Sequence, residues 1–197
     1  PARLALKLSG NSVRTIDIIP GSVVTEEGRA VVSVKNGVWE RDEQDIVKIA
    51  VVERHNGTGN VGLGLIRNYG LRGGAVATSV AHDSHNIIVV GDSDSDMTVA
   101  VEKLLELGGG IAVVKDGKVL DFIQHEIAGL MTDKPGIYVE EKISSMQALA
   151  RKELGINDNV DPFMTLCFMA LPVIPAIKIT DMGLFDVTKF AFTPIEV

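Results

Sequence analysis

The chain has 197 residues, of which 46% are hydrophobic and 23% charged, so it is long enough and apolar enough for one well-buried globular domain. Its formal net charge of −7, with no cluster of lysines or arginines, argues against a nucleic-acid partner. No apolar run reaches the roughly 20 residues that a membrane-spanning helix needs, so no membrane partner is expected.

The first residues and the single cysteine indicate the cellular compartment of the protein. The first residues show no signal-peptide pattern, and the single cysteine, Cys167, lies in an apolar stretch. We therefore expect a buried thiol in a reducing, cytoplasmic setting. Because the chain begins at Pro1 without a methionine, it is expected to be a fragment or a processed product.

Residues 1–37 are predicted to form a short β-rich segment. Residues 3–8 and 13–19 alternate as strands do, with a Gly10-Asn11 turn between them. Another short strand is expected at 30–34, before a tight turn at Asn36-Gly37. Few large apolar residues occur here, which indicates either a linker or the tail of a preceding domain, so we place a boundary between residues 37 and 38.

From Asp45 onward the pattern is that of an α/β domain. Residues 46–52 form a nearly continuous apolar run, typical of a strand buried on both faces. Further strands are predicted at 75–81 and 87–90, and at 111–114 and 119–123 with an Asp116-Gly117 turn between them. Helices are predicted from about Met97 to Gly108 and from about Tyr138 to Leu154, the second ended by Gly155. The predicted fold class for 38–197 is therefore α/β, a mixed β-sheet with packed helices.

Two motifs imitate known binding loops. Gly57-Thr-Gly-Asn-Val-Gly62 fits the G-x-G-x-x-G pattern of dinucleotide-binding proteins, with Asp83 about 20 residues on. However, residues 63–71 contain two glycines and are too short for a crossover helix, which favours a loop whose backbone approaches another surface or a ligand.

The second motif, Asp92-Ser-Asp-Ser-Asp96, resembles the start of a calcium loop. Met97 and Lys103 stand where such a loop requires glycine and glutamate, so the motif is interpreted as a helix cap.

The most polar stretch between two apolar strands is His82-Asp83-Ser84-His85-Asn86. Its histidines could supply two metal ligands with Asp83 as a third, or they could do acid–base work or contact substrate. A polar hairpin whose histidines satisfy nearby backbone groups is the structural alternative. The positions of the remaining histidines, His55 and His125, relative to this stretch do not follow from the sequence.

Seven blocks of sequence, in order, carry a resemblance to a known family. They are ERHNGTGN at 53–60, AHDSHN at 81–86, ELGGG at 106–110, AGLMTD at 128–133, DPF at 161–163, ALPVIP at 170–175 and ITDMGLFD at 179–186. Together they make residues 38–197 similar to the C-terminal domain of bacterial and archaeal adenine deaminases, in the amidohydrolase superfamily. Residues 1–37 match only loosely, at 19–26.

This resemblance implies hydrolysis of adenine to hypoxanthine and ammonia in purine salvage, with a divalent metal, manganese or iron. In that family the metal lies in a β/α barrel that precedes this domain. The chain contains no His-x-His motif, so we expect it to bind no metal or other cofactor by itself and to be inactive alone. The implied partners are the barrel, the substrate adenine and further copies of the enzyme in a homo-oligomer.

We expect the domain to close over the barrel's site, with His82, Asp83 and His85 as catalytic residues. The residues expected to bind the substrate are Arg54, His55, Ser84 and Asn86, and no metal ligand is assigned. Two other functions stay open at this point: a stand-alone nucleotide- or metabolite-binding module, and a structural or dimerisation domain.

Overall fold

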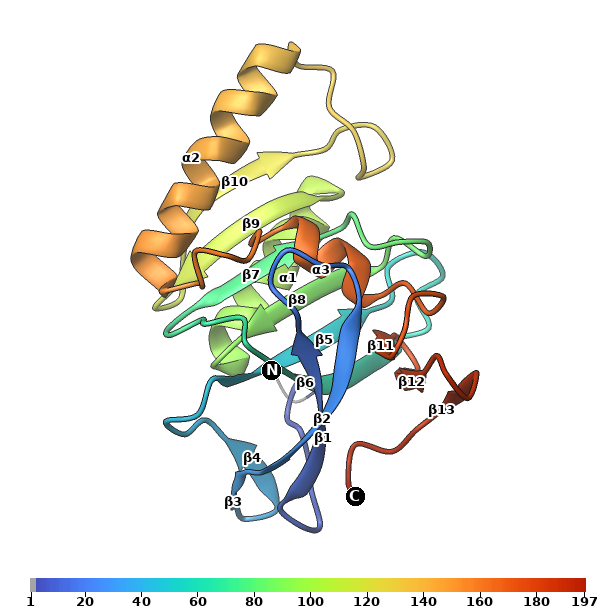
Figure 1. Ribbon diagram of the computed structural model, residues 1–197. Coiled ribbons are helices and arrows are strands. Elements are labelled where there is room, and N and C mark those ends of the chain that lie inside the picture. Colours follow the sequence, from blue (N-terminus) through green and yellow to red (C-terminus); the bar gives the residue numbers. More distant parts are fainter. Residues whose placement is uncertain (1–2) are drawn as a thin grey trace.

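An eight-stranded β-sheet forms the centre of the computed structural model, which describes residues 3–197 (Figure 1). The strand order is β10-β9-β7-β8-β5-β6-β1-β2. All neighbours pair antiparallel except β1 and β6, which pair parallel. The strands are β1 Ser12–Ile18, β2 Thr25–Val31, β5 Ile46–Val52, β6 Val61–Arg67, β7 Ala75–Thr78, β8 Ile87–Gly91, β9 Gly110–Lys115 and β10 Lys118–Gln124.

Helices cover both faces of the sheet. In β8, Ile87 and Val89 pack in one core with helix α1, Asp94–Leu107. Ile88 and Val90 point the other way, into a second core that contains residues of α2, Gly136–Leu154, and α3, Met164–Met169. The side-chain alternation of a strand thus divides the interior into two layers, and the predicted α/β class, a mixed sheet with packed helices, is confirmed.

Local signals set the ends of the long helices. The Ser93 side chain accepts a hydrogen bond from the backbone N–H of Asp96 at 3.2 Å, and Gly108 ends α1 in the left-handed conformation. The interpretation of residues 92–96 as a helix cap is confirmed. Gly155 ends α2 in the same left-handed way, as predicted. Among residues 3–197, no helix is both long enough and apolar enough to cross a bilayer.

Two small sheets accompany the large one. The hairpin of β3, Ser33–Lys35, and β4, Val38–Glu40, turns at Asn36 and Gly37, both with positive φ, as predicted. The other small sheet comprises β11 Ile177–Thr180, β12 Gly183–Asp186 and β13 Ala191–Phe192.

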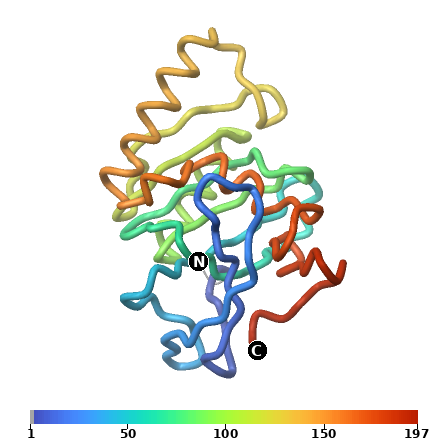
Figure 2. The backbone as a smooth tube through the Cα atoms, in the orientation of Figure 1, coloured from blue at the N-terminus to red at the C-terminus, as the bar shows by residue number. Residues whose placement is uncertain are grey.

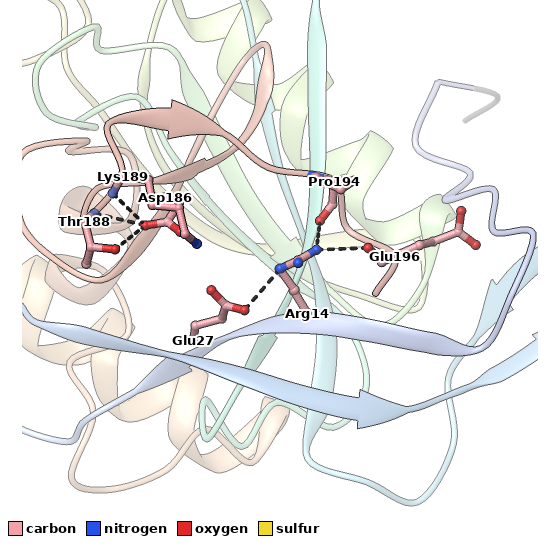
Figure 3. A network of polar contacts seen from close by, with 7 residues as sticks. All are labelled: Arg14, Glu27, Asp186, Thr188, Lys189, Pro194 and Glu196. Carbon is pink, nitrogen blue, oxygen red and sulfur yellow. Dashed lines mark hydrogen bonds and ion pairs between the residues drawn. The ribbon is translucent and has the colours of Figure 1, made fainter.

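The N-terminal strands belong to the large sheet, and the C-terminal tail is fastened to them. Strands β1 and β2 lie at one edge of that sheet, beside β6. The Arg14 guanidinium donates to the carbonyl oxygens of Pro194 and Glu196, at 2.7 and 2.9 Å, and to the Glu27 carboxylate (Figure 3). A boundary at residue 37 stays a prediction, since β1 and β2 share the sheet with the segments that follow them.

Two predicted segments differ from the structure. Residues 3–8 form no regular strand: Lys7 makes one isolated bridge to Val38, while Leu6 and Leu8 are buried in a core with Trp39. Residues 61–67, predicted as part of a glycine-rich loop and a mixed segment, form strand β6. Because β6 pairs antiparallel with β5, residues 57–62 join a hairpin, which excludes a dinucleotide-binding crossover.

Gly62 explains why β6 tolerates glycines. A Cβ at this position would lie 1.9 Å from the Thr180 carbonyl oxygen, so only glycine lets the turn after β11 approach the strand. The close backbone approach expected of the glycine motif thus occurs at Gly62, although this residue lies in a strand and not in the predicted loop.

We predict that Gly62→Ala destabilises the domain by about 1–3 kcal/mol, because the turn at 180–183 must move away from β6. Urea unfolding measures this difference. Gly136→Ala is the matched control, since a Cβ there meets nothing within 4 Å. An unchanged unfolding midpoint for Gly62→Ala would contradict the packing described here.

Candidate functional site

Several loops meet at one edge of the large sheet. The antiparallel pairing places the last residues of β5, β7 and β10 beside the first residues of β6, β8 and β9. The connecting segments 53–60, 79–86, 108–110 and 125–135 therefore gather on the right-hand side of the molecule in Figure 2. The predicted site residues all come from the first two of these segments.

Residues 82–86 form a tight corner, hereafter the His82–Asn86 corner. The backbone N–H of His82 donates to the Cys167 carbonyl at 3.0 Å, and the His82 ring lies 5.1 Å from the Phe168 ring. The ring of His85 stands edge-on to that of His82, with centroids 5.6 Å apart. Asp83 and Ser84 are exposed at the tip, whereas the Asn86 side chain is buried.

Arg54 holds the corner against its neighbours. Its Nε donates to the His85 carbonyl at 2.7 Å, and its terminal nitrogens donate to the carbonyls of Ala128 at 3.0 Å and Gly108 at 3.5 Å. Its backbone N–H also donates to Asn86 Oδ1 at 3.3 Å. Partial burial lowers the pKa of the guanidinium, which stays charged. Arg54 thus fixes three loops through their main chains.

His55, in the loop 53–60, contacts the corner at Ser84. Its Nε2 is 2.8 Å from the Ser84 carbonyl oxygen, which can only accept, so Nε2 carries the hydrogen. In the neutral ring, Nδ1 is then an acceptor. Glu53 shapes this loop by accepting from the backbone N–H groups of Asn56 at 2.6 Å and Thr58 at 3.0 Å, which lowers the pKa of Glu53 to about 2.

His85 has the opposite tautomer. Its Nδ1 accepts from the backbone N–H of Ala81 at 3.3 Å, which leaves Nε2 as the donor in the neutral ring. Burial lowers the pKa of His85 below its ordinary value, and the nearby His82 and Arg54 lower it further. The lowered pKa favours the neutral ring, which the acceptor role of Nδ1 also requires. The site edge carries one imidazole acceptor, at His55, and one imidazole donor, at His85.

The donor set does not fit a resident metal ion. Within residues 3–197, no group of three or more histidine, cysteine, aspartate or glutamate side chains is arranged to hold one. His82, Asp83 and His85, which the sequence offered as a metal triad, therefore form no such group in the structure.

A cavity of about 310 Å³ opens beside the tip of the corner. Asp83 and Ser84 form one wall, and the loop after α3 with the β11–β12 turn forms the other. Its remaining lining residues are Ala170, Pro172, Val173, Thr180, Asp181, Met182 and Phe192.

The chain matches the adenine deaminase C-terminal domain family over residues 22–191. This chain belongs to that family. Adenine deaminase 2 of Carboxydothermus hydrogenoformans is 47% identical over 197 residues, which cover 100% of this chain and 34% of the relative. Adenine deaminase 2 of Desulfotalea psychrophila is 50% identical, over 98% of this chain and 34% of the relative. Adenine deaminase of Clostridium acetobutylicum is 45% identical, over 96% and 33%.

The chain spans about a third of the length of these curated relatives, and the family that it matches is that of the adenine deaminase C-terminal domain. The family match starts at residue 22, inside the segment that the resemblance covered only loosely. Strand β2, which begins at Thr25, therefore falls within the matched domain.

The structure brings the seven predicted site residues together, but it gives them different surroundings. His55, Asp83 and Ser84 are exposed, and His82 and His85 are half-buried. Arg54 and Asn86 are engaged with the protein's own backbone. His125 makes none of the hydrogen bonds described for the corner: it is buried after β10, where its backbone N–H donates to the Gly109 carbonyl at 3.1 Å. Sequence patterns missed Glu53 and the carbonyl groups that Arg54 binds.

Cys167 supports the corner through its carbonyl, and its thiol is 3% exposed. Burial raises the pKa of the thiol to about 12, and the nearby Asp161 carboxylate raises it further. Almost no thiolate is therefore present at pH 8. We predict that a thiol reagent labels the native protein far more slowly than the same protein in concentrated urea. Equal labelling rates in the two conditions would contradict this.

Proposed function

We propose that this domain completes the active site of an adenine deaminase, which hydrolyses adenine to hypoxanthine and ammonia in purine salvage. The family match and the names of the relatives support the reaction. The observation that carries the role of this domain is the pair of opposite tautomers at His55 and His85, held by the main chain at one edge of the sheet. The divalent metal, manganese or iron, is assigned to the catalytic portion outside this chain.

The two imidazoles suit the hydrogen-bonding groups of adenine. Adenine carries donors on its 6-amino group and acceptors at its ring nitrogens. An acceptor at His55 Nδ1 and a donor at His85 Nε2 are the complementary pair. In hypoxanthine a carbonyl replaces the amino group, so the donor for which His55 supplies an acceptor is lost. We propose that this difference favours adenine over product at the corner.

The remaining predicted residues take supporting roles in this proposal. Asp83 and His82 are the groups at the corner that can exchange a proton with the substrate. Ser84 offers a hydroxyl at the exposed tip. Arg54 and Asn86 act by position, because their polar atoms already hold the loops that carry His55 and His85.

We predict that the 197-residue protein alone does not release ammonia from adenine, with or without added Mn²⁺ or Fe²⁺. The reason is that residues 3–197 contain no set of side chains arranged for a metal. An ammonia assay with the full-length enzyme as positive control measures this. Metal-dependent ammonia release by the purified domain would contradict the division of labour proposed here.

We predict opposite effects for two substitutions of His85 in the full-length enzyme. In His85→Asn, the side-chain oxygen of asparagine takes the place of Nδ1, so the variant keeps the acceptor for the Ala81 N–H but loses the Nε2 donor. The melting temperature should stay nearly unchanged, while kcat/KM for adenine falls about 10- to 100-fold, the value of one buried hydrogen bond. In His85→Gln, the side-chain amide of glutamine can donate from about the position of Nε2 but does not accept from the Ala81 N–H. This variant should therefore keep more activity and lose stability.

His82→Asn provides the comparison within the same corner, because His82 packs on Phe168 and its backbone N–H alone donates to Cys167. Kinetics and thermal unfolding are measured for all three variants. Full activity with lowered stability in every variant would make the corner architectural and leave adenine binding to other residues.

A further inference from the structure

A group of exposed apolar side chains extends from the His82–Asn86 corner across the C-terminal strands. Val173, Met182, Phe190 and Phe192 are exposed by 64%, 70%, 76% and 53%. We call this set the C-terminal apolar face. Large apolar side chains that gather at this exposure mark an interaction surface more often than an ordinary part of a protein surface.

The aromatic residues of this face are held rigidly. The Phe185 ring stands edge-on to Phe190 at 5.3 Å and to Phe192 at 5.4 Å. Asp186 fixes the turn before Phe190, because its carboxylate accepts from the backbone N–H groups of Thr188 and Lys189 (Figure 3). Side chains that are already ordered lose little entropy when a partner covers them, so the face is preorganised for binding.

The C-terminal apolar face and the His82–Asn86 corner line the same cavity. The cavity of about 310 Å³ is lined by Val173, Met182 and Phe192 on one side and by Asp83 and Ser84 on the other. Asn60 Nδ2 also donates to Asp181 Oδ2 at 3.1 Å, which ties the β11–β12 turn to the loop that carries His55. A macromolecule that covers the cavity therefore contacts both this face and the tip of the corner at Asp83 and Ser84.

We propose that the C-terminal apolar face docks the portion of the adenine deaminase that lies outside residues 1–197. This inference rests on the proposed function of the corner. This chain spans about 34% of the length of its relatives, so a polypeptide about twice its size is available to cover the face. A second copy of this domain would cover the corner without supplying the metal ligands that residues 3–197 lack.

Cysteine accessibility in the full-length enzyme tests the proposal. Met182→Cys is compared with Ile137→Cys, a control on α2 with 63% exposure and no part in the cavity. For each variant the labelling rate in native buffer is divided by its rate in concentrated urea, with the unsubstituted enzyme as background. We expect Met182→Cys to be protected at least about tenfold, as at the covered centre of an interface. A rate equal to that in urea overturns the proposal.

The same measurement identifies the occupant. It is repeated at enzyme concentrations where sedimentation shows single chains. Protection that persists there supports docking within one chain, whereas protection that disappears on dilution assigns the face to a second copy and overturns the proposal.

An activity measurement separates this inference from the proposed function. Met182→Glu should lower kcat/KM for adenine about tenfold by disturbing the docked face, while Ile137→Glu leaves it unchanged. If the His85 variants keep full activity but Met182→Cys stays protected, docking holds and the role of the corner fails. If the His85 variants lose activity and Met182→Cys is labelled freely, the corner holds and docking fails.

Discussion

The burial of the central strands on both faces is the constraint on which this structure depends. Every residue of β8 and the first six of β5 are buried, so each strand supplies side chains to two cores at once. Their backbone groups have no access to water and must pair with neighbouring strands. The polar side chains of the candidate site therefore lie beyond the ends of these strands, and the His82–Asn86 corner directly precedes β8.

Main-chain acceptors, more than charge pairs, hold the corner together. The Arg54 guanidinium meets three carbonyl oxygens, and His82, His85 and His55 are each fixed through a backbone group. Carbonyl groups do not titrate, so this clamp keeps its partners across a pH range in which carboxylates and imidazoles change charge. The contacts that Arg54 makes therefore do not depend on the charge of the histidines beside it.

Local signals in the sequence predicted much of this fold. Turns such as Asn36-Gly37 and Asp116-Gly117 have the positive φ angles that their residue types allow, and each joins two strands of an antiparallel hairpin. Strand β6 was not predictable in this way, because its Gly62 meets a turn more than 100 residues later in the chain. Helix α3 is only six residues long, too short for a helical pattern within an apolar run.

The candidate site, like the fold, could be predicted from the sequence only in part. The clustering of polar residues at 82–86 identified the corner, because such groups are costly to place between buried strands. The tautomers of His55 and His85 depend on backbone atoms of Ser84 and Ala81, whose positions only the folded chain defines. The same holds for Arg54, whose partners are all carbonyls. Residue types thus predicted which side chains gather at the corner, and the geometry supports the roles proposed for them.

The pairing of β1 has a consequence for how this domain folds. One end of β1 pairs with β6 at Ile16 and Asp17, and the other end pairs with the last residues of the chain, through Ser12 and Arg14. Contacts between segments so distant in sequence close very large loops, whose entropy must be lost before the contacts form. We therefore expect the pairing of β1 with β6 and with residues 195–197 to form after the central hairpins.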